Sequence, residues 1–131
     1  KHRIEDALEA IKAAQLEGIV PGGGTTLIKI TQKIKVKTSN EWQDLGVKIV
    51  LEAVKEPLKQ MALNAGDSPD LILAKVLSAK KNHGWNFVTS KLENLYDVGI
   101  IDPAKVTRCA LQNAASVAST LITTDHAIIE A

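Results

Sequence analysis

The sequence has few aromatic residues, a single cysteine and almost no net charge. Two Trp, one Tyr and one Phe in 131 residues are too few for the stacking platform of a single-stranded nucleic-acid binder. Sixteen Lys and Arg against 15 Asp and Glu give a net charge of +1, without the basic excess of proteins that bind nucleic acids or membrane surfaces. No apolar run reaches membrane-spanning length. We therefore expect neither a nucleic acid nor a membrane as partner.

The cysteine and histidine content also excludes two kinds of stabilising site. One cysteine cannot form an internal disulfide, and the three histidines show no zinc-ligand spacing. We expect no metal site, and Cys109 is interpreted as a small core residue. The chain is 45% hydrophobic, which is enough for a hydrophobic core at the length of one domain.

Helical periodicity dominates what is present. Ile4, Ala7, Leu8 and Ile11 follow the spacing of one helix face, and Gly18 suits the position just after a helix end. No capping residue precedes this helix, so we expect the chain to begin inside a longer one. Further helices are predicted at about 25–34, 40–54, 57–65, 69–77 and 103–120, and short strands at 85–88 and 127–130. The predicted fold is mainly α, multihelical with a few short strands.

Two of these helices carry specific expectations. The segment 40–54 is apolar on all sides, which is typical of a buried helix, so we expect it to be the most buried element. Asp102 followed by Pro103 is interpreted as an N-cap and a first-turn proline.

The triple glycine Gly22–Gly24, directly before a helix, is the strongest single candidate for a site. Glycines allow a close backbone approach to a ligand, but a tight turn between two helices has the same composition. The motif is neither a P-loop nor a dinucleotide fingerprint. Asp6 lies opposite the apolar face of its helix, as a solvated carboxylate would. Asn86 is either a structural loop residue or a group that binds an adenine edge.

Several motifs together resemble the C-terminal part of group I chaperonins, the GroEL type. They are RIEDALEA at 3–10, EGIVPGGG at 17–24, GIIDPAKVTR at 99–108, and AASVA at 114–118 followed by ITT at 122–124. The resemblance extends over essentially the whole chain, in order and with matching spacing. It implies that residues 1–17 are the last helix of the intermediate domain. Residues 18–131 would then be the C-terminal half of the equatorial, ATP-binding domain.

The resemblance also implies a set of nucleotide contacts. Asp6 would assist the water that attacks the γ-phosphate, and Asp102 would bind the ribose hydroxyls. The remaining contacts, to the adenine and the ribose, would come from Gly22, Gly23, Gly24, Asn86, Phe87, Val88 and Ile100. The family usually has alanines in place of Phe87 and Val88, so the space left beside Phe87 decides whether adenine can bind.

The cofactors implied are ATP and ADP, with Mg²⁺ and K⁺. The family's phosphate-binding loop and magnesium-binding aspartate lie in the N-terminal half, so we expect little or no ATP hydrolysis by this chain alone. The partners implied are identical subunits in seven-membered rings. Unfolded proteins and a co-chaperonin would bind an apical domain outside this chain. A bacterial member would be cytoplasmic, and an organellar one would lie in the plastid stroma or mitochondrial matrix. The alternative is a helical assembly module without nucleotide activity.

Overall fold

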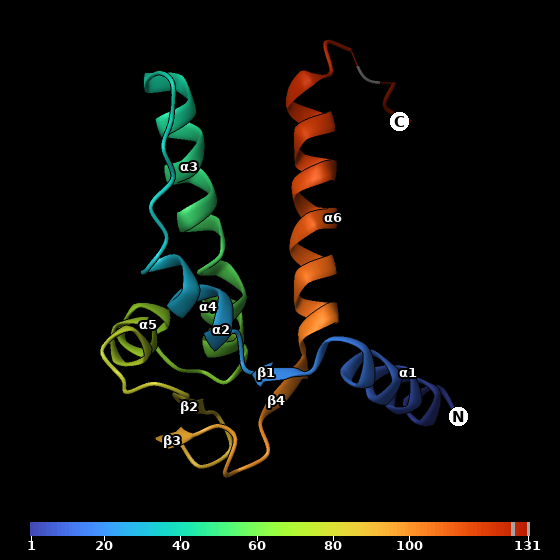
Figure 1. Cartoon of the computed structure of the whole chain (residues 1–131), viewed down its shortest axis with the longest axis vertical. Helices are drawn as coiled ribbons and strands as arrows, with labels where there is room; N and C mark the ends of the chain where they lie inside the picture. Colours follow the sequence, from blue (N-terminus) through green and yellow to red (C-terminus); the bar gives the residue numbers. More distant parts are fainter. Residues whose placement is uncertain (127, 131) are drawn as a thin grey trace. The chain divides into compact units, whose positions relative to one another are not determined.

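The computed structural model describes residues 1–126 and 128–130, and these residues fold mainly into helices joined by short strands (Figure 1). The elements are α1 (His2–Glu17), β1 (Ile19–Pro21), α2 (Thr25–Thr31), α3 (Glu41–Ala53), α4 (Glu56–Asn64), α5 (Pro69–Leu77), β2 (His83–Asn86), β3 (Lys91–Asn94), β4 (Ile101–Pro103) and α6 (Ala104–Thr123). This confirms the mainly α fold with few short strands. None of the described helices is long and apolar enough to cross a membrane.

The chain divides into two compact units. We call Lys1–Ile19 together with Asp102–Ala131 the terminal unit, and Val20–Ile101 the central unit. Strands β2 and β3 form one two-stranded sheet and β1 and β4 form another. The assignment of residues 1–17 and 18–131 to two chaperonin domains stays a prediction.

In the terminal unit, α1 packs on α6 and an ion pair joins them. Arg108 donates two hydrogen bonds to the Glu17 carboxylate, one of them from Nε to Oε2 at 3.0 Å, and a third from Nη1 to Oε1 of Gln112 at 2.8 Å. The hydrogen bond and charge of Arg108 lower the pKa of Glu17, and the same contact raises the pKa of Arg108. Helix α1 ends as predicted at Gly18, whose φ of 83° is accessible to glycine at little cost.

The predicted cap of the last helix is wrong. Helix α6 begins at Ala104 with Pro103 as its N-cap, and no side chain caps it. Asp102 lies in β4 and is exposed. The physical reason is that Pro103 has the extended backbone conformation of an N-cap, with ψ of 130°, which places Asp102 one residue too early to cap.

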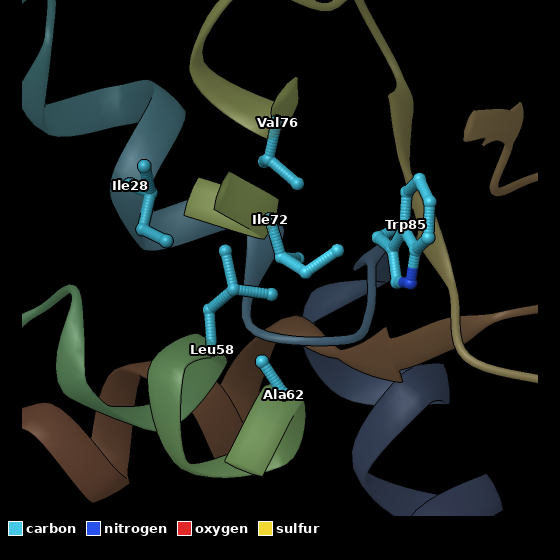
Figure 2. Close-up of a cluster of buried hydrophobic side chains, with 6 residues drawn as sticks. All are labelled: Ile28, Leu58, Ala62, Ile72, Val76 and Trp85. Atoms are coloured by element: carbon cyan, nitrogen blue, oxygen red, sulfur yellow. The ribbon is translucent and has the colours of Figure 1, made fainter. Parts of the chain in front are cut away.

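The central unit has a hydrophobic core built from α2, α4, α5 and β2 (Figure 2). Its buried members are Ile28, Leu58, Ala62, Ile72, Val76 and Trp85. The pairs 58/62 and 72/76 are four residues apart, so each pair lies on one helix face. Pro57 and Pro69 occupy the first turns of α4 and α5, as predicted. The core therefore depends on two short helices facing each other, with Trp85 of the hairpin alongside.

The β2–β3 hairpin is antiparallel, with Trp85 opposite Leu92 and Asn86 opposite Lys91. Gly84 makes the hairpin's close approach to α2 possible. A Cβ there would lie 2.6 Å from Thr25 Oγ1 and 2.7 Å from Leu95 Cδ1, and both of those residues are fully buried.

The expectation that the segment 40–54 is the most buried is wrong. Helix α3 contains no buried residue, and Trp42 and Ile49 are 82% and 61% exposed. Burial begins only at Val54, directly after the helix. An apolar surface is buried only where another element packs on it, and within the described residues α3 has no extensive contact with another helix or strand. Only Val47 and Leu51 of this helix are partly buried. The predicted cap is present, because Asn40 Oδ1 accepts a hydrogen bond from Gln43 N at 2.9 Å.

The strand predicted at 127–130 is not observed over the residues that can be assessed. Residues 128–130 have no strand conformation, and residue 127 lies outside the described residues. β-Branched residues at a chain end favour a strand only where a partner strand pairs with them.

Candidate functional site

The triple glycine forms a tight turn between β1 and α2, in the central unit. Gly23 and Gly24 have φ of 64° and 73°, a left-handed conformation that other residues adopt only with strain. A Cβ on Gly24 would lie 3.1–3.3 Å from N, Cα and Cβ of Leu58. The close packing of the turn on α4 therefore explains why residue 24 is a glycine. Gly23 has different neighbours.

Gly23 lies beside Ile100 and the β2–β3 hairpin. A Cβ built on Gly23 would lie 3.8 Å from Ile100 Cγ2 and 3.9 Å from the backbone oxygen of Trp85. Next to it, Gly22 N donates a hydrogen bond to Ile100 O at 2.9 Å. The fold thus brings together two segments, 22–24 and 100, that are far apart in the sequence. This pairing was expected only from the resemblance.

Asn86 is buried and its side chain is used within the hairpin. Nδ2 donates to Glu93 Oε2 at 2.6 Å, and Oδ1 accepts from Val88 N at 2.9 Å. Asn86 is 7% exposed. Of the two interpretations of Asn86, its hydrogen bonds favour the structural one, because they hold the loop that follows β2.

Phe87 and Val88 lie in different surroundings. Phe87 is partly buried and packs against the core residues of the central unit, whereas the Val88 side chain is 93% exposed. The larger side chain that replaces the usual alanine is therefore accommodated, at least in part, by the core.

The two candidate carboxylates, Asp6 and Asp102, both belong to the terminal unit. Each is exposed, Asp6 on α1 and Asp102 in β4. Neither takes part in an ion pair with another described residue. Both are thus available to a ligand or to water. Within the described residues, no three His, Cys, Asp or Glu side chains are grouped to hold a metal ion.

A model of the TCP-1/cpn60 chaperonin family matches residues 1–131. The chain belongs to this chaperonin family. The match covers every residue that carries the resemblance, from the motif at 3–10 to the one at 122–124. Two features of the chaperonin chain were not predicted from the sequence: the Glu17–Arg108 ion pair, and a pocket of the central unit that is lined by Lys29, Lys33 and Lys81. Lys29 lies in α2, whereas Lys33 lies in the turn that follows the helix, so the four-residue spacing alone does not place them on one helix face.

Proposed function

We propose that this chain is the C-terminal part of a group I, GroEL-type subunit and supplies the adenosine side of its ATP site. Residues 1–17 would be the last helix of the intermediate domain and residues 18–131 half of the equatorial domain. The chaperonin family match over the whole chain supports this proposal, as do the group I motifs at 17–24 and 99–108.

The contact between the glycine turn and Ile100 is the observation that carries the nucleotide proposal. A flat base binds between an apolar side chain on one face and, on the other, a backbone surface where no side chain blocks its approach. Gly23 has no Cβ, and Ile100 is the side chain nearest to the position a Cβ would occupy. We therefore place the adenosine group at Gly22, Gly23, Gly24 and Ile100, with Phe87 and Val88 on the hairpin side.

Asp6 and Asp102 are assigned roles that suit exposed carboxylates. Asp102 would accept hydrogen bonds from the ribose hydroxyls, and Asp6 would orient the attacking water and accept its proton. ATP would supply the phosphoanhydride that is cleaved, together with Mg²⁺ and K⁺, and the magnesium-binding aspartate would lie outside this chain. We infer that the free energy of ATP hydrolysis drives protein folding by rings of identical subunits, with seven subunits in each ring. Unfolded proteins and a co-chaperonin would bind the apical domain of those subunits.

Gly23→Ala is expected to weaken ADP binding to the 131-residue chain by about tenfold or more, since one methyl group in a tight site has an effect of that size. Gly66→Ala is the matched control. Gly66 also has a left-handed backbone, with φ of 79°, but a Cβ there would meet nothing within 4 Å. Both variants should lose about 1–2 kcal/mol of stability through backbone strain. Isothermal titration calorimetry should show unchanged ADP affinity for Gly66→Ala. Equal affinities for the two variants would refute a nucleotide contact at Gly23.

A further inference from the structure

The central unit has an open pocket of about 290 Å³ between α2 and the segment 79–82. Its lining residues are Pro21, Thr25, Thr26, Lys29, Ile30, Gln32, Lys33, Ala79, Lys81 and Asn82. None of these is among the residues proposed to contact adenosine. At this volume the pocket lies at the lower end of the range for small-molecule sites, so its ligand is small.

The charges around this pocket are all of one sign. Lys29, Lys33 and Lys81 line it, and no Asp or Glu does. None of these lysines forms an ion pair with a residue that the structure describes. The chain as a whole has a net charge of only +1. Three lysines without ion-pair partners at one small pocket therefore create a local positive potential, which an anion would neutralise.

Lys29 is fixed in place by the segment on the far side of the pocket. Its Nζ donates hydrogen bonds to Ala79 O at 3.2 Å and to Lys80 O at 2.6 Å. An ammonium group has three donors, so one remains for a ligand. Partial burial, and secondly the charge of Lys33, lower the pKa of Lys29. A bound anion would oppose both effects, because an opposite charge nearby stabilises the charged form of the lysine.

We propose that this pocket binds a polyvalent oxyanion of the phosphate class. The fixed ammonium of Lys29 supplies one directed donor, and the exposed Lys33 and Lys81 supply two further positive charges. Pro21 and Ile30 form an apolar part of the lining beside the lysines. The site is independent of the adenosine contacts at Gly23 and Ile100, and the proposal stands without them.

The test is a pyrophosphate titration of the full 131-residue chain at low ionic strength, followed by ¹H–¹⁵N correlation spectra. We expect saturable shifts at the amides of the pocket residues, and weaker binding as salt is added. Lys33→Gln and Lys81→Gln should each weaken binding by about tenfold, the size of one charge-assisted hydrogen bond. Neither lysine side chain makes a hydrogen bond to a described residue, so both variants should fold. Lys91→Gln removes an exposed lysine in β3, outside the pocket lining, and should leave the affinity unchanged.

Two further outcomes decide the proposal. Chemical-shift changes at lysines outside the pocket, or an equal loss of pyrophosphate affinity in Lys91→Gln, would show that pyrophosphate binds only by non-specific charge attraction. Either result would contradict the proposed site. Adenosine, which has no phosphate, distinguishes this pocket from the nucleotide site. Adenosine should not compete with pyrophosphate, and competition would show that the pocket is not an independent oxyanion site. Failure of adenosine to bind at Gly23 would remove the proposed function and leave this site standing.

Discussion

Asp6→Ala in the complete, assembled subunit is expected to slow ATP turnover by about 100-fold or more, while ATP affinity stays nearly unchanged. A side chain that orients water and accepts its proton contributes about 10²–10⁴-fold to rate. The interaction forms in the transition state, so its loss lowers turnover and not ground-state binding. The structure gives Asp6 the exposure that this role needs, since the carboxylate has no ion-pair partner among the described residues of either unit.

Glu9→Ala is the control for Asp6. Glu9 is an exposed carboxylate on the same helix, and its contact is an ion pair with Lys12 at 3.1 Å. Turnover should be unaffected by Glu9→Ala, measured as phosphate release at saturating ATP. If Asp6→Ala weakens ATP binding but leaves turnover of the bound nucleotide intact, Asp6 is a binding residue and the assigned role is wrong.

Leu58→Ala is expected to destabilise the central unit by about 2–5 kcal/mol, the range for a fully buried leucine. Leu58 is 0% exposed and belongs to the core with Ile28, Ile72 and Val76 (Figure 2). Its backbone and Cβ also pack against the turn at Gly24, so the cavity would form directly beneath the candidate site. A loss of this size is a large fraction of the total stability of a small domain.

Leu63→Ala tests whether burial, and not helix composition, causes this effect. Leu63 lies on the same helix, α4, but is 57% exposed, so its removal should have a small effect. Urea unfolding followed by fluorescence suits both variants, because Trp85 is buried and reports on the core. A Trp42→Phe background would remove the signal of the exposed Trp42. Comparable losses for Leu58→Ala and Leu63→Ala would contradict the core described above.

Local chemistry made several features predictable from the sequence. Asn40 caps α3, Pro57 and Pro69 lie in the first turns of α4 and α5, and Gly18 follows the end of α1. Each of these features depends only on neighbouring backbone groups. The mainly helical fold followed from periodicity over long segments.

Features that depend on distant contacts were not predictable in the same way. Helix α3 was expected to be buried because it is apolar on all sides, yet composition does not show whether another element covers it. The N-cap of α6 was predicted one residue too early, at Asp102, because an Asp-Pro pair is compatible with either residue as the cap. The hydrogen bond between Gly22 and Ile100 joins residues 78 positions apart, and only the family resemblance indicated this pairing. The lysine pocket arises because the segment 79–82 returns to α2, which local patterns do not reveal.

The most direct measurement is a titration of the 131-residue chain with ADP, followed residue by residue in ¹H–¹⁵N correlation spectra. The proposed adenosine site predicts saturable shifts at Gly22, Gly23, Gly24 and Ile100, with smaller shifts at Phe87 and Val88. Saturation with no shift at the glycine turn, or no binding at millimolar ADP, would contradict a nucleotide site in this chain. That result would leave a chaperonin-family chain whose contribution is structural.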